Sequence, residues 1–248
     1  DVGTDAAVAF QNFEAEKNAA PGNNRRIKQS ERKELEAKRA ARVGEGVDEL
    51  MAALEEAGNL DGILTAVKGL LQLPSDNLRL LLSGKKRYDY RLAWVGGDDA
   101  VCHVGTGLHK VPLARLQEVF MTCLGRNRME VLEVIRILGP FPNVKNTLQG
   151  TTKITKGGST NDGMVSLNIV MDSMVDGTGK EILAGTDDNI RRVDLQVYFA
   201  DERAIVAVVP PEDGGFRENP LADNGVNVLV FVKEGELEEK LDALRVLQ

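Results

Sequence analysis

The sequence predicts an α+β fold, in which a helical N-terminal segment precedes an antiparallel β-barrel of about eight or nine strands and a C-terminal helix. Apolar residues recur at helical spacing over residues 30–83, and over residues 88–233 they mostly alternate with polar ones. About nine strands without helices between them exclude a doubly wound α/β domain and leave a sandwich or a barrel. The barrel is favoured because closure removes exposed strand edges.

Composition and charge narrow the class of protein. The chain has 248 residues, of which 42% are apolar, enough for a sizeable core. No apolar run reaches the roughly 18 residues of a membrane-spanning helix, so we expect a soluble or peripheral protein. Residues 21–43 carry eight Lys or Arg against three Glu in a chain of net charge −7. Overall acidity argues against nucleic-acid binding, whereas the basic segment suits a solvated helix face or a dock for an anionic surface.

Changes in the spacing of apolar residues divide the chain into four parts. We expect a leader with a basic helix at 1–45, a helical module at 46–84, the barrel at 85–235 and a C-terminal helix at 236–248. The expected strands are 88–95, 100–105, 115–123, 129–138, 147–156, 164–172, 191–200, 203–209 and 226–233. Turn-forming residues separate most of these strands, as a meander requires.

The sequence offers few residues for catalysis. His103 is a neighbour of Cys102 on the expected strand 100–105, so the two side chains should project to opposite faces and cannot share a metal. The stretch "DGTGKE" (176–181) lacks the spacing of a phosphate-binding loop and predicts a tight turn. We assign no catalytic residue and no metal site. Free thiols at Cys102 and Cys123 are favoured over a disulfide.

Aromatic residues are scarce, at 4% of the chain, and they gather on the expected first strand. In "YDYRLAWV" (88–95), Tyr88, Tyr90, Leu92 and Trp94 should share one face. That face can pack in the core, line a cavity or meet a hydrophobic partner, with core packing favoured.

The stretch "GPFPNVKNTLQG" (139–150) predicts a rigid corner between two strands. Pro140 and Pro142 fix φ and interrupt regular pairing. Asn143 and Asn146 can satisfy the backbone groups that this interruption frees. Phe141 is then either a plug at the barrel end or an exposed anchor.

This layout resembles the plastid lipid-associated proteins, also called plastid fibrillins. The resemblance covers roughly residues 45–235 and is carried by the helical start, "YDYRLAWV", "GPFPNVKNTLQG" and "NGVNVLVFVK". It implies a lipocalin-like barrel, a place on thylakoids or plastoglobules, and binding of lipids, carotenoids or quinones without catalysis. Tyr88, Tyr90, Trp94 and Phe141 become the candidate contacts to a lipid, a pigment or a partner.

Two segments go beyond a simple carrier barrel: the N-terminal leader and the acidic loop 210–225. They favour a non-enzymatic, thylakoid-associated scaffold that fastens photosystem and light-harvesting proteins together, with lipid, carotenoid or chlorophyll at its periphery. The alternative is a lipocalin-like carrier that binds a lipid, carotenoid or quinone inside the barrel. A carrier needs an open cavity with the Tyr88 and Trp94 face inside, whereas a scaffold can fill its barrel.

Overall fold

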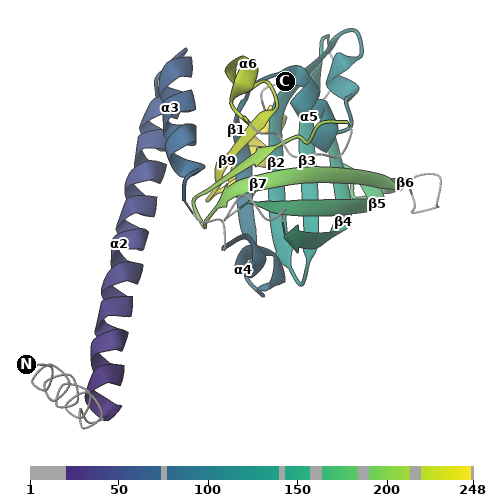
Figure 1. Ribbon diagram of the computed structural model, residues 1–248. Coiled ribbons are helices and arrows are strands. Elements are labelled where there is room, and N and C mark those ends of the chain that lie inside the picture. Colours follow the sequence, from purple (N-terminus) through teal and green to yellow (C-terminus); the bar gives the residue numbers. More distant parts are fainter. Residues whose placement is uncertain are drawn as a thin grey trace, which may run out of the picture. The chain divides into compact units, whose positions relative to one another are not determined.

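The computed structural model in Figure 1 describes residues 21–73, 77–139, 143–156, 164–183, 190–212 and 219–246. Residues 1–20 of the expected leader, Phe141 and residues 213–218 of the expected acidic loop lie outside the described residues. The chain separates into two compact units, Asp1–Glu45 and Gly46–Gln248.

Helix α2 (Pro21–Glu55) begins in the first unit and ends in the second. Its side chains over residues 31–42 are exposed and include the ion pairs Arg32–Glu36 and Glu34–Lys38 at i,i+4 spacing. Within the second unit the helix acquires an apolar stripe, because Val47, Leu50 and Ala53 recur at a spacing of three and are buried.

Two shorter helices, α3 (Leu60–Leu70) and α4 (Asn77–Ser83), complete the helical stretch predicted from the sequence. Gly58, with φ +81°, allows the turn after α2, and the Asn59 side chain caps α3 by accepting a hydrogen bond of 2.9 Å from the Gly62 amide. The helical prediction for residues 30–83 is therefore confirmed in its described part.

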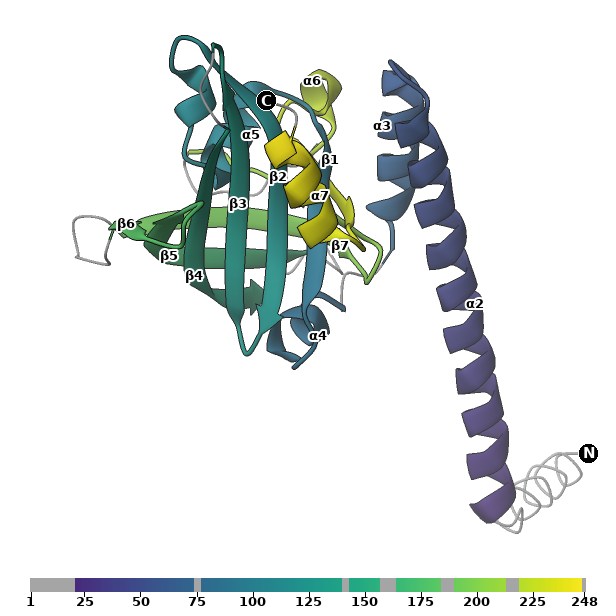
Figure 2. The ribbon, with the colours of Figure 1, turned by 180° about the vertical axis from the view of Figure 1, so that it is seen from behind.

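The described strands form one antiparallel sheet that closes on itself. They are β1 (Tyr88–Val95), β2 (Ala114–Gly125), β3 (Arg128–Ile137), β4 (Val144–Lys156), β5 (Val165–Asp176), β6 (Glu181–Leu183), β7 (Arg191–Ala200), β8 (Ala204–Val208) and β9 (Val228–Lys233). The sheet order runs from β4 through β1 and β9 to β5, and β4 also pairs with β5, so eight strands make a ring with β6 added beside β5. Figures 1 and 2 show this ring from two sides. Eight of the nine expected strands are confirmed, and they pair antiparallel.

One expected strand is wrong: residues 100–105 do not extend the meander but belong to helix α5 (Asp98–Val104). Ala100, Val101 and Val104 are the buried residues of this helix, at the spacing of one helical face. Cys102 and His103 therefore do not alternate across a sheet.

The short strand β6 was not expected. The predicted turn before it is confirmed, because the Asp176 carboxylate accepts hydrogen bonds from the amides of Thr178 (2.9 Å) and Lys180 (3.0 Å).

A bulge in β1 changes which aromatic side chains face the core. The pairing of β1 with β9 shifts between Leu92 and Trp94. Leu92 and Val95 consequently both pack on the interior of the ring, whereas Trp94 is not part of that core. The expected single face of Tyr88, Tyr90, Leu92 and Trp94 is therefore wrong at Trp94.

Two helices close the ends of the ring. Leu78, Leu81 and Leu82 of α4 enter the core at one end, and Ala100, Val101 and Val104 of α5 enter it at the other. Figures 1 and 2 both place α4 and α5 at opposite ends.

The predicted C-terminal helix is confirmed as α7 (Leu237–Val246), and it covers part of the outer face of the ring. Its Leu237 and Leu241 pack against Phe120 of β2 and Val134 of β3. The remaining short elements are the 3₁₀ turn η1 (Leu108–Lys110), after α5, and helix α6 (Ala222–Gly225), before β9.

Candidate functional site

Two charged side chains face the interior of the ring near the α5 end. Glu133 of β3 lies on the same face of the strand as Met129 and Val131, which are in the core, and it is fully buried at 0% exposure. Arg191, the first residue of β7, pairs with the core residue Met171 and so faces inward too. Burying a charged side chain costs folding free energy unless hydrogen bonds or an opposite charge compensate it.

The loop after α5 compensates Glu133. The Thr106 amide donates to Oε1 at 2.9 Å, and the Thr106 hydroxyl donates to Oε2 at 2.5 Å. Gly105 permits this approach, since a Cβ atom there would lie only 1.9 Å from Glu133 Oε1. A buried carboxylate thus ties the loop to the middle of β3.

The last turn of α5 and the first residue of the loop after it bind Arg191. The guanidinium donates to the carbonyl oxygens of Gly105 and Cys102, and it donates to that of His103 at 2.8 Å. Burial lowers the pKa of Arg191, and the negative charge of Glu133 opposes that shift. Together the two charges fix the loop over the end of the ring.

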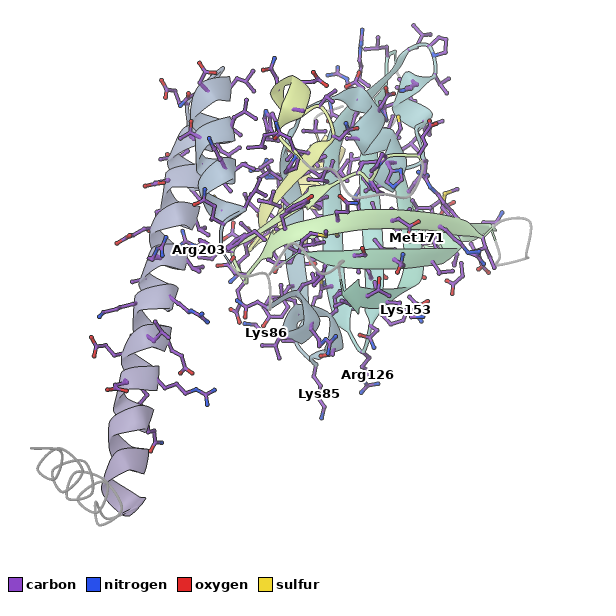
Figure 3. The ribbon with its side chains drawn as sticks, viewed as in Figure 1. Lys85, Lys86, Arg126, Lys153, Met171 and Arg203 are labelled. Carbon is purple, nitrogen blue, oxygen red and sulfur yellow. The ribbon has the colours of Figure 1, made fainter. Side chains whose placement is uncertain are left out.

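A cavity of about 430 Å³ lies beside this charged pair. Its lining residues come from the loop and η1 (Thr106, Gly107, Leu108, Val111), from β4 (Asn146, Leu148), from β5 (Met171, Asp172, Ser173, Met174) and from β7 (Arg191). Figure 3 labels Met171 on β5 among these elements. The walls are mainly apolar, and the polar groups come from only a few positions.

Asn146 is the most deeply placed neutral polar residue of the cavity. It is 4% exposed, pairs with Glu133 across β3 and β4, and lines the cavity. Its side chain has no hydrogen-bond partner among the described residues. Pro140 and Pro142 of the expected corner lie outside the described residues, and the side-chain amide of Asn143 donates instead to the Leu244 carbonyl of α7 at 2.7 Å.

The two cysteines are free thiols, as favoured from the sequence. Burial raises the pKa of Cys123 to about 12. Cys102 lies 3.6 Å from His109 Nε2, a pair that the sequence did not suggest because it placed Cys102 on a strand. His109 Nδ1 is buried without a partner among the described atoms, so no acceptor orients the imidazole as in a cysteine-based catalytic triad.

The predicted contact residues do not meet in the cavity. Tyr90 is fully buried in the core and donates to the Asp201 carbonyl at 2.9 Å, while Tyr88 donates to Glu202 at 2.9 Å nearer the surface. Trp94 lies beyond the bulge, and Phe141 is outside the described residues. None of the three described residues, Tyr88, Tyr90 and Trp94, lines the cavity beside Arg191.

The sequence did contain a signal for the residues that were missed. In "MEVLEVIRI" (129–137), Glu133 occupies the phase of the apolar Met129 and Val131. In "RRVDLQVYF" (191–199), Arg191 likewise shares the phase of Val193. A charge on the buried phase of a strand marks a special interior site.

Within the described ranges, no group of three or more His, Cys, Asp or Glu side chains is placed to hold a metal ion. Among the same residues, no helix combines the length and apolar character needed to cross a membrane. Comparisons with protein-family models, with curated proteins and with solved structures found no match for this chain.

Proposed function

We propose that this protein is a non-enzymatic, lipocalin-like binding protein that holds a small, largely apolar molecule at the α5 end of its ring. The observation that carries the proposal is the cavity of about 430 Å³ lined by Leu108, Val111, Leu148, Met171 and Met174. Ligand pockets of about 300–1,000 Å³ with apolar walls and a few polar groups are typical of small-molecule sites.

The size of the cavity restricts the ligand. A volume of about 430 Å³ equals roughly 14 water molecules at about 30 Å³ each. This suits a short lipid or a quinone head group, whereas a long carotenoid or a chlorophyll would project into solvent. At the usual binding energy per ligand atom, we expect dissociation constants on the order of 1–100 µM.

Filling the cavity tests the proposal. Titration with the neutral fluorescent amine N-phenyl-1-naphthylamine should give saturable binding to the full chain. Met174→Trp should weaken this binding at least about tenfold, because the larger side chain occupies the space that the probe needs. Equal binding by the parent chain and this variant would overturn the proposal.

A matched control separates cavity filling from a general effect of a new tryptophan. Leu138 is 41% exposed and does not line the cavity, so Leu138→Trp should bind the probe as the parent does. Thermal unfolding of both variants checks that the ring is intact.

A second candidate function, the scaffold predicted from the sequence, is favoured by the first part of α2. Its side chains over residues 31–42 are exposed and strongly charged, which is typical of a helix that bridges between larger bodies. The partners would be the photosystem and antenna proteins implied by the plastid fibrillin resemblance. Deleting residues 1–28 should abolish co-migration with chlorophyll proteins in a density gradient and leave the ring folded; unchanged co-migration would contradict the scaffold.

A further inference from the structure

We propose that the cavity selects a ligand with an uncharged polar head group, a hydroxyl or a carbonyl, and that Asn146 is the residue that recognises it. The inference rests on the proposed ligand-binding function and names the ligand class. Three features of the α5 end carry it: an unpartnered amide, a guanidinium that is already engaged, and an acidic rim.

The unpartnered amide is Asn146. The Asn146 side chain is 4% exposed, lines the cavity and makes no hydrogen bond to another described residue. Its carboxamide offers donors and an acceptor on the cavity wall. A ligand hydroxyl matches both functions, and a ligand carbonyl matches the donors.

Arg191 is the residue that would ordinarily bind a carboxylate. Here its N–H groups point to the carbonyl oxygens of Gly105, Cys102 and His103. Glu133 supplies the opposing charge. A ligand carboxylate would therefore have to displace backbone acceptors and compete with an internal carboxylate.

The third feature is Asp172, an exposed residue of the cavity lining next to Met171. Asp172 and Arg191 are the charged residues of the described lining, and because Glu133 already opposes the charge of Arg191, the negative charge of Asp172 is left uncompensated. That charge repels an anionic head group and leaves a neutral one unaffected.

A matched pair of ligands tests the inference on the full chain. Dodecan-1-ol and dodecanoate have the same chain length and differ in the charge of the head group. At pH 8, the alcohol should displace N-phenyl-1-naphthylamine at a concentration at least about tenfold lower than the carboxylate does. Tighter binding of dodecanoate would overturn the inference while leaving the proposed function standing.

Variants locate the recognition at Asn146. Asn146→Leu should weaken dodecan-1-ol about tenfold by removing the hydrogen bonds to the hydroxyl, while probe binding changes little. Gln149→Leu removes an amide from the outer face of the same strand, where Gln149 donates to Glu130 at 2.8 Å, and should leave the alcohol unaffected. Equal losses in both variants, or none in Asn146→Leu, would overturn the assignment. If no probe or ligand binds at all, the proposed function itself fails.

Discussion

At one end of the ring, α4 inserts three leucines, Leu78, Leu81 and Leu82, into the core; at the other, α5 inserts Ala100, Val101 and Val104. Both helices have seven residues. The α4 leucines belong to the same core cluster as Tyr90 and Cys123 and do not line the cavity, which lies at the α5 end. Small apolar residues leave space that large ones would fill, and polar groups give that space its specificity.

The largest effect should come from breaking the charged pair at the α5 end. Glu133→Leu would leave the half-buried Arg191 without its opposing charge and the Thr106 donors unpaired. We expect the free energy of unfolding in urea to fall by about 3–5 kcal/mol. Glu130→Gln, on the outer face of the same strand, should cost less than about 1 kcal/mol. Similar, small losses in both variants would remove the distinction between the two faces.

Leu82→Ala addresses the α4 end. Leu82 is fully buried, and its loss should reduce stability by about 3 kcal/mol through the cavity it creates. Leu80→Ala is the matched control on the same helix, because Leu80 is 69% exposed, and it should change stability by less than about 0.5 kcal/mol. Probe binding at the far end should survive both changes; its loss in Leu82→Ala would show that the two ends are not independent.

The α4 end should also lose stability at alkaline pH. Burial raises the pKa of Cys123 from its ordinary 9.0 to about 12, and burial raises the pKa of Tyr90 as well. The fold therefore favours the protonated thiol: this stabilisation is complete below pH 9 and is lost as pH rises towards 12, by up to about 1.4 kcal/mol per pH unit. Cys123→Ala should flatten the decline between pH 9 and 11 in urea titrations. An unchanged slope would contradict the burial of this thiol.

The smallest effect on stability is expected from replacing the exposed cations near the α4 end. Lys85 and Arg126 point away from the ring in Figure 3, and both are exposed. Replacing both with Gln should alter the free energy of unfolding by less than about 0.5 kcal/mol, since surface charges contribute little. A loss above about 1 kcal/mol would show that charge, in addition to the leucines, stabilises this end.

Regular alternation made most of the ring predictable. Val193, Leu195 and Val197 lie in the core, as their period of two predicts. The helix α5 was missed because a short apolar run such as "AVCHVG" suits a strand or a buried helix equally well.

The bulge after Leu92 was missed for a different reason. Trp94 leaves the inner face only because β1 and β9 shift register there, and one strand's sequence does not specify its partner's register.

The sequence alone indicated the inward charges of the candidate site and not their contacts. Glu133 and Arg191 interrupt the buried phase of their strands, which is a signal in the sequence itself. Glu133 bonds to Thr106 and Arg191 bonds to the carbonyl oxygen of Cys102, contacts that join residues 27 and 89 positions apart. Such long-range contacts depend on how the ring closes, and local pattern does not encode them.

The side-chain amide of Asn146 can be followed directly by two-dimensional ¹⁵N–¹H NMR. During titration of the full chain with dodecan-1-ol, we predict a saturable shift of the Asn146 NH₂ signals, and no shift of those of Gln149 on the outer face. Unshifted Asn146 signals, with saturable changes confined to the Trp94 indole or other groups outside the cavity, would contradict the account.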